Sequence, residues 1–392
     1  MGIKTCSFVE RNDTMSIARY LLLVVLLATT ATGCIVLRKA RPTRVPSAQS
    51  LHLLGVWERE TGARFQDTYV GGLSGIDYDS ARNCYYLICD DRSERNPARY
   101  YTAAIHFSMQ GIDSVQWLRV DSLRQPDGSL FPGRGTDPEA IRYNALTDEL
   151  VWTSEGERTL TEKRTALQNP TIRVMNRNGQ YLDSFPIPGN VRVQATETGM
   201  RDNGVFEGLS FTPDYKEMFV SIEEPLYQDG PRAGAGDSAA WIRILRYNVA
   251  DRKLLAQYAY QIDPVARPAD PPGAFKINGI PDILHLGNNI MLVMERSFST
   301  GKTACTIRIY LADLSRATDV SSIQSLNKKK SIFRPVQKQL LLNMDSLNRY
   351  IDNVEGMTIG PRLPNGNPSL IMVADENFSK NEKMQFFLFE LK

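Results

Sequence analysis

The sequence of 392 residues is 42% hydrophobic and 23% charged, and its formal net charge is +2. These fractions are those of a globular protein, and the near-neutral charge excludes a strongly basic chain built to bind nucleic acid. The length fits either two ordinary domains or one large repeat domain.

The N-terminus has the pattern of a secretory signal. Residues 20–31 are almost wholly apolar, basic residues precede them, and small residues follow. The stretch 31–34 (ATGC) resembles the bacterial lipobox, although Ala31 stands where Leu is usual. We therefore expect residues 1–34 to be a signal peptide with Cys34 as the lipidation site, and residues 35–50 to be a basic, Pro-containing tether.

An uncleaved membrane helix is the alternative, because residues 17–37 are long enough to span a bilayer. Four basic residues follow directly, at Arg38, Lys39, Arg41 and Arg44. The positive-inside rule would hold that side of a permanent anchor in the cytoplasm. We therefore favour a lipid anchor, which would place the protein in the bacterial cell envelope, on the periplasmic or the cell-surface side.

A short phrase recurs along the rest of the chain. Its clearest form is FEGLSFTPD at residues 206–214, where a Glu-Gly pair opens an apolar run. Self-similarity at a fixed period is the signature of repeat architectures. Five copies lie 65 to 75 residues apart when they are counted from Ser74, Glu139, Glu207, Asp282 and Glu355.

Each copy is followed by a turn and then by a β-rich run that ends in acidic residues. In the third copy this run is MFVSIEE, at residues 218–224. Apolar and β-branched residues bounded by turn signals are typical of strands. The other runs are at residues 85–91, 150–155, 290–295 and 370–376.

Two further β runs follow in each of the first four units, so a full unit holds four antiparallel strands, as a β-propeller blade does. The last unit ends at residues 385–391 and lacks a fourth strand. The run at residues 51–57 can supply that strand and close the ring. We predict an all-β fold, a single β-propeller over residues 51–392 with about five four-stranded blades closed by an N-terminal strand. A sixth blade merged into units three to five is the alternative.

The repeated Glu begins one strand and the acidic residues end the next, so hairpin geometry places the two side by side. The expected neighbours are Ser74–Asp90, Glu139–Glu155, Glu207 with Glu223 and Glu224, Asp282–Glu295 and Glu355–Asp375. Each acid alone fits ordinary turn chemistry, but their repetition favours one shared mouth. Clustered carboxylates repel unless a cation compensates, and such oxygen ligands suit Ca²⁺. The predicted metal ligands are Asp90, Glu155, Glu223, Asp282, Glu295 and Asp375.

Three residues of the repeat, Glu139, Glu207 and Glu355, are the candidate catalytic groups, because a free carboxylate can act as a general base toward water. The candidate substrate-binding residues are Arg92, Arg134 and Arg296, which lie beside the acidic ends or the loop before Glu139. They could hold a phosphate or a carboxylate, or pair with the acids in structural networks. The sequence contains no phosphate-loop or dinucleotide fingerprint.

Three cysteines fall within the predicted propeller. Cys84 and Cys89 flank one strand and point to opposite faces, so a disulfide between them is not expected. Cys305 has no partner at a zinc-site spacing. We predict that all three are buried thiols.

The repeated phrases resemble the bacterial phytase-like family, described as having esterase-like activity. The similarity covers about residues 65–391, and its clearest stretches are 72–79, 137–141, 206–210, 353–357 and 374–378. The resemblance implies a secreted or lipid-anchored propeller that hydrolyses esters or phosphoesters and is related to calcium-dependent propeller phytases.

Two functions follow from these features. The first is a calcium-dependent hydrolase that acts on a small-molecule ester or phosphoester at an acidic propeller mouth. The second is a non-catalytic, calcium-stabilised propeller that binds a glycan, a peptide or another envelope ligand. In either case we expect a monomer that is attached to the membrane through its lipid and that binds no nucleic acid.

Overall fold

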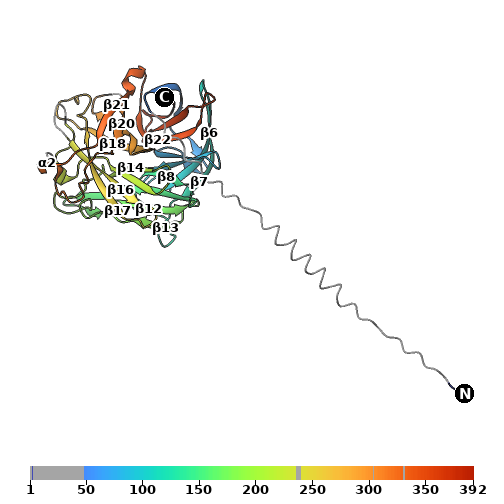
Figure 1. The fold of residues 1–392 in the computed structure, drawn as a ribbon, viewed down its shortest axis with the longest axis horizontal. Helices are drawn as coiled ribbons and strands as arrows, with labels where there is room; N and C mark the ends of the chain where they lie inside the picture. Colours follow the sequence, from blue (N-terminus) through green and yellow to red (C-terminus); the bar gives the residue numbers. More distant parts are fainter. Residues whose placement is uncertain (1, 3–47, 235–239, 303, 330–331) are drawn as a thin grey trace. The chain divides into compact units, whose positions relative to one another are not determined.

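The computed structural model describes residues 2, 48–234, 240–302, 304–329 and 332–392 (Figure 1). The predicted signal peptide (apart from Gly2), its Cys34 and the predicted tether as far as residue 47 lie outside the described residues. Among the described residues, no helix is long and apolar enough to cross a membrane.

The described chain folds into five antiparallel sheets of four strands each, and the first strands of successive sheets lie side by side, so the sheets are the blades of a β-propeller. The strands of blade one, from the inner to the outer edge, are β4 (Leu73–Asp79), β5 (Cys84–Cys89), β6 (Arg99–Ser108) and β7 (Gly111–Ser122). Those of blade two are β8 (Pro138–Asn144), β9 (Glu149–Ser154), β12 (Thr171–Asn176) and β13 (Tyr181–Phe185).

Blades three and four repeat this order. The strands of blade three are β14 (Phe206–Phe211), β15 (Glu217–Ile222), β16 (Ala240–Asn248) and β17 (Leu254–Ile262). Those of blade four are β18 (Lys276–Gly287), β19 (Ile290–Ser299), β20 (Thr306–Asp313) and β21 (Gln337–Asn343). The acid-ending runs of the sequence are thus the second strands of their blades.

Blade five is built from both ends of the propeller. It contains β22 (Asn353–Arg362), β23 (Pro368–Asp375) and β24 (Lys383–Leu391), and its outer strand is β1 (Leu51–Glu60). The pairing of β1 with β24 is antiparallel and runs from Leu51 opposite Leu391 to Glu60 opposite Lys383. The predicted five-blade propeller, closed by the N-terminal strand, is therefore confirmed.

Short helical turns and hairpins lie in the loops between the blade strands. They include the short helix α2 (Leu326–Lys329) and the 3₁₀ turn η3 (Met344–Leu347). A 3₁₀ turn and two short hairpins were not predicted: η1 (Tyr227–Asp229), β2 (Arg64–Phe65) with β3 (Thr68–Tyr69), and β10 (Glu157–Leu160) with β11 (Thr165–Gln168).

The core lies between neighbouring blades, because successive side chains of a strand point to opposite faces. Along β5, Cys89 belongs to the apolar cluster that includes Ile371 of blade five, whereas Cys84 belongs to the cluster that includes Trp152 of blade two. Cys84, Cys89 and Cys305 are all buried free thiols, as predicted.

The glycine of the repeated Glu-Gly phrase lets neighbouring inner strands approach closely. A Cβ atom on Gly208 of β14 would lie 2.7 Å from the backbone nitrogen of Ile283 and 2.8 Å from the Cα of Asp282, both on β18. A Cβ on Gly75 would lie 2.7 Å from the carbonyl oxygen of Glu139 in the next blade. Neither contact is tolerable against backbone atoms, so any side chain here would push two blades apart.

Replacing Gly208 by Ala is therefore expected to destabilise the propeller by about 1–3 kcal/mol through overpacking. Urea unfolding at constant Ca²⁺ measures this change. Gly189→Ala is the matched control, because a Cβ on Gly189 meets nothing within 4 Å. Equal stabilities of the two variants would show that the inner strands can move apart freely.

Candidate functional site

Each inner strand carries a β-bulge at the same place. The ladder to the second strand is interrupted at Ser74, Glu139–Ala140, Glu207–Gly208, Ile280–Pro281 and Glu355. A bulged residue is left out of the ladder, and its side chain is re-aimed. In three of the five blades, the first bulged residue is Glu.

Hydroxyl groups fix these bulges. The backbone N–H of Ala140 donates to Oγ1 of Thr153 (2.9 Å), and that of Gly208 donates to Oγ of Ser221 (3.1 Å). In blade one, Oγ of Ser74 donates to the carbonyl oxygen of Glu139 (2.8 Å). The side chains that replace the missing ladder partners hold the bulged residues in place, and Ser74 has a structural role.

A second row of acids lies beside the bulged row. The backbone N–H groups of Asp90, Glu155 and Glu223, each just past the end of a second strand, donate to carbonyl oxygens just before the inner strand of the same blade (2.8–3.0 Å). Asp375, the last residue of β23, pairs with Asn353, the first residue of β22. These contacts bring both rows to one end of the propeller, as the sequence predicted.

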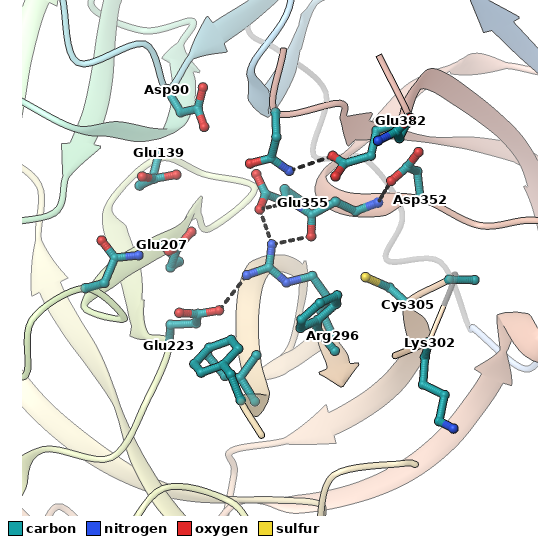
Figure 2. Close-up of a pocket in the computed structure, with 18 of the residues that line it drawn as sticks. Asp90, Glu139, Glu207, Glu223, Arg296, Lys302, Cys305, Asp352, Glu355 and Glu382 are labelled. Carbon is teal, nitrogen blue, oxygen red and sulfur yellow. Dashed lines mark hydrogen bonds and ion pairs between the residues drawn. The ribbon is translucent and has the colours of Figure 1, made fainter. Parts of the chain in front are cut away.

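Most of these acids line a cavity of about 780 Å³, and Glu155 and Asp375 are not among its lining residues. In Figure 2, Asp90, Glu139, Glu207 and Glu223 lie on one side of Arg296, and Lys302 and Cys305 lie on the other. The charged lining residues are eight acids and three bases: Asp90, Asp137, Glu139, Glu207, Glu223, Asp352, Glu355, Glu382, Arg92, Arg296 and Lys302. The cavity therefore has a strong excess of negative charge.

Among the residues that the structure describes, two groups of three carboxylates each have one oxygen atom per residue within 4.8 Å of the others, and Glu155 belongs to both groups. One group is completed by Asp137 and Glu139, and the other by Glu207 and Glu223. Oε1 of Glu155 accepts a hydrogen bond from the backbone N–H of Val205 (2.6 Å), whereas its buried Oε2 has no hydrogen-bond partner among the described residues. A buried carboxylate oxygen without a partner is costly unless a cation or a proton compensates for it.

The protonation of these groups reflects the same crowding. Burial raises the pKa of five carboxyl groups well above the ordinary range, and neighbouring carboxylates raise it further: Asp90, Glu139, Glu155, Glu207 and Asp375. Burial also raises the pKa of Asp137 to about 6, although Arg92 opposes the change. The cluster is therefore poorly compensated by the protein alone.

The three predicted arginines are placed differently. Arg296 donates to Glu223 and Asn353 (2.8 and 2.7 Å) and pairs with Glu355, so its guanidinium is largely engaged. Arg92, whose side chain is 30% exposed, pairs with Asp137 and donates to Asn203. These two arginines line the cavity.

Arg134 lies beside the cavity. It pairs with Glu94 and Glu157 at 3.3 and 3.8 Å and lines a small adjoining depression together with Glu155. Its guanidinium is therefore not among the groups that line the main cavity.

Four of the predicted metal ligands are not among the residues that line the cavity: Glu155, Asp375, Asp282 and Glu295. Asp282 and Glu295 are paired with other residues. Both carboxylate oxygens of Asp282 accept from Nη2 of Arg142 at 2.8 Å, and both residues are buried. Glu295 pairs with Lys338 (2.5 Å) and accepts from the hydroxyl of Tyr260 (2.9 Å). Each carboxylate thus has its own partners, and the expected contact between the two is not found.

The cause is the position of the bulge in blade four. Its bulged residues are Ile280 and Pro281, so Asp282 takes the place that Leu209 has in blade three. By the same register, Ser297 stands where blade three has Glu223. The sequence alignment of the fourth unit is thus two residues out of register, and blade four contributes no acid at either position.

Replacing Asp282 by Asn is expected to destabilise the protein by about 3 kcal/mol, because it leaves the buried Arg142 without its counter-charge. The affinity for Ca²⁺ should remain within about twofold of the wild type, because Asp282 lies outside both carboxylate groups. Urea unfolding and calcium titration of the same samples separate the two effects. Loss of Ca²⁺ binding by a folded Asp282→Asn protein would show that Asp282 is a calcium ligand after all.

Asp137, a further possible ligand, was not predicted from the sequence. The residue directly precedes Pro138 and Glu139 in the repeated phrase, and its carbonyl oxygen accepts from the N–H of Glu155. It lies two positions before the repeated Glu, where no other unit has an acid, so the repeat did not mark it.

Comparisons with known proteins agree with this fold. The model of the phytase-like family, described as "esterase-like activity of phytase", matches residues 68–378. No curated protein matches the chain.

Two solved propellers are similar at low identity. One is the Dos1 propeller, with 10% identity over 83% of this chain and 68% of that chain and a TM-score of 0.32. The other is the periplasmic gluconolactonase PpgL of Pseudomonas aeruginosa, with 11% identity over 87% of this chain and 96% of that chain and a TM-score of 0.35.

Proposed function

We propose that this chain, which belongs to the phytase-like family, is a calcium-dependent hydrolase of an ester or phosphoester in the bacterial cell envelope, anchored by a lipid on Cys34. The observation that carries the proposal is Glu155, a buried carboxylate shared by two acidic groups with one oxygen left without a partner. The family description supports the reaction class, and the acidic cavity supports the cation.

The residues present fit a hard cation. Ca²⁺ takes six to eight oxygen ligands, mostly carboxylates, carbonyls and water. The carboxylates that would hold it are Glu155 together with Asp137 and Glu139, or Glu155 together with Glu207 and Glu223. When bound, Ca²⁺ polarises an ester or phosphoryl oxygen and offsets the charge that develops on it.

The remaining groups have roles that follow from their contacts. Of the three repeat glutamates, Glu139 and Glu207 each belong to a carboxylate group, whereas Glu355 is held by Arg296 and Asn353. A repeat glutamate that holds no ion takes the proton from the attacking water, and its raised pKa brings it closer to the working pH. Arg92, partly exposed at the cavity, orients an anionic group of the substrate.

Hydrolysis of p-nitrophenyl acetate and p-nitrophenyl phosphate in Ca²⁺ tests the proposal, with Glu207→Gln as the variant. A loss of about 100-fold or more in kcat/KM is expected for one of these substrates. Glu217→Gln is the control, because Glu217 begins β15, at the opposite end of that strand from the cavity, and pairs with Arg246.

The alternative predicts a different result. Strong stabilisation by Ca²⁺ without turnover of either substrate would favour a non-catalytic propeller that binds a glycan, a peptide or an envelope partner. Absence of Ca²⁺ binding, together with unchanged hydrolysis by Glu207→Gln, would contradict both functions.

The proposed anchor has its own test. Labelled fatty acid should be incorporated into the full-length chain expressed in bacteria, and Cys34→Ser should abolish the label and release the protein from the membrane fraction. Persistent membrane attachment of Cys34→Ser would favour the uncleaved helix.

A further inference from the structure

Blade four differs from the other blades at the mouth of the cavity. Beyond its bulge, the ladder between β18 and β19 continues for four pairs, from Gly279 opposite Arg296 to Lys276 opposite Ser299. The corresponding ladders of the other blades end after one or two pairs. The open end of the β18–β19 strand pair, opposite to the turn at residues 288–289, therefore projects past the level of the bulged glutamates.

The residues at this projecting end are apolar on the side that faces the cavity. Phe275, Ile277 and Phe298 line the cavity, and the loop that follows β19 adds Ala304 and Cys305. The rings of Phe275 and Phe298 are 6.2 Å apart between centroids, and Phe275 is 56% exposed. We call these five residues the apolar wall.

The rest of the cavity lining is polar. Blades one, two, three and five contribute its carboxylates, asparagines and Arg92, together with Tyr350. The carboxylates and the apolar wall thus lie on different blades, and Arg296 of β19 lies between them (Figure 2). The wall also has a charged neighbour, because Lys302 lies in the same loop as Ala304 and Cys305 and lines the cavity. An exposed Phe in a polar cavity leaves apolar surface in contact with water. Packing an apolar part of a ligand against it removes that surface from water, which is favourable.

We propose that the substrate carries an alkyl or aryl group that packs against the apolar wall while its ester or phosphoester group lies among the carboxylates. This inference rests on the proposed function, because it takes the reacting group to lie at the acidic side. The occupant is part of a small molecule, since the apolar wall faces a cavity of about 780 Å³ that also holds the charged groups. Phe275 and Phe298 are then the residues that determine specificity.

Isothermal titration with methyl-, butyl- and hexylphosphonate in Ca²⁺ tests the apolar wall without requiring turnover. Affinity for the wild type should rise with chain length, by up to about fourfold for each added CH₂. Phe275→Ser should flatten this dependence and leave methylphosphonate binding unchanged. Because the Phe275 side chain is exposed, we expect the variant to fold as the wild type does. Leu146→Ser is the control, because Leu146 is 65% exposed in the turn between β8 and β9.

The inference is overturned if no phosphonate binds, if affinity is independent of chain length, or if Phe275→Ser keeps the wild-type dependence. Hydrolysis of p-nitrophenyl acetate, butyrate and hexanoate separates this failure from failure of the proposed function. Turnover with equal kcat/KM along the series would overturn the inference and leave the hydrolase standing. Chain-dependent phosphonate binding that Phe275→Ser flattens, without turnover of any ester, would support the apolar wall and contradict the hydrolase.

Discussion

Removal of divalent cations is expected to lower the thermal midpoint of the protein and to make its stability fall as the pH rises. The buried carboxyl groups at the mouth have a raised pKa in the folded chain, so the folded state binds more protons than the unfolded state. Stability contributed in this way is present below the ordinary pKa and is lost as the pH rises through the folded pKa. The loss should extend from about pH 4.5 to about pH 7, because burial raises the pKa of Asp137 to about 6 and that of Glu224 to about 7.

Added Ca²⁺ should reverse the loss. At a hundredfold excess over its Kd, a ligand of the folded state stabilises it by about 2.7 kcal/mol, which corresponds to roughly 3–4 °C for a chain of this size. Thermal scans at pH 5, 6, 7 and 8, with chelator and with Ca²⁺, measure both effects. A chelated protein that is most stable at pH 8, or a midpoint that Ca²⁺ leaves unchanged, would contradict a cation-compensated cluster.

The second large effect is expected for Glu155→Gln. Because Glu155 belongs to both carboxylate groups, its loss should weaken Ca²⁺ binding by about 100-fold or more, at or beyond the upper end of the losses seen for residues that only support metal ligands. The same change removes a buried negative charge from a crowded cluster, so the chelated variant should be more stable than the chelated wild type.

The opposite signs of these two changes separate loss of a ligand from general damage, which would lower affinity and stability together. Glu157→Gln is the matched control, because Glu157 lies two residues along the chain and pairs with Arg164 and Arg134 outside both groups. Calcium titration and thermal scans of both variants give the comparison. If Glu155→Gln binds Ca²⁺ with wild-type affinity, Glu155 is not a calcium ligand.

The fold could be predicted from the sequence because the same pattern of strands recurs in each of the five units. The phrase around Glu207 and the acid-ending strand after it recur in five units, and each unit is one blade. The incomplete last unit and the unpartnered run at residues 51–57 together predicted the closing strand, which the pairing of Leu51 with Leu391 confirms.

The site was predicted less completely, because the sequence does not show where the bulge of blade four falls or how far its β ladder extends. In blade four the acid nearest the repeated position is Asp282, but the bulge falls on Ile280 and directs Asp282 toward Arg142. A strand alignment that differs by two residues leaves the hydrophobic alternation intact, so the sequence pattern could not reveal it. The apolar wall was also hidden, because the length of a β ladder past its bulge depends on pairing that no motif marks.

The most direct test is a crystal structure of the protein grown in millimolar Ca²⁺. An ion is predicted within about 2.3–2.6 Å of a carboxylate oxygen of Glu155, with further ligands from Asp137 and Glu139 or from Glu207 and Glu223. A cavity without an ion, or a Ca²⁺ ion bound only away from Glu155, would contradict the account.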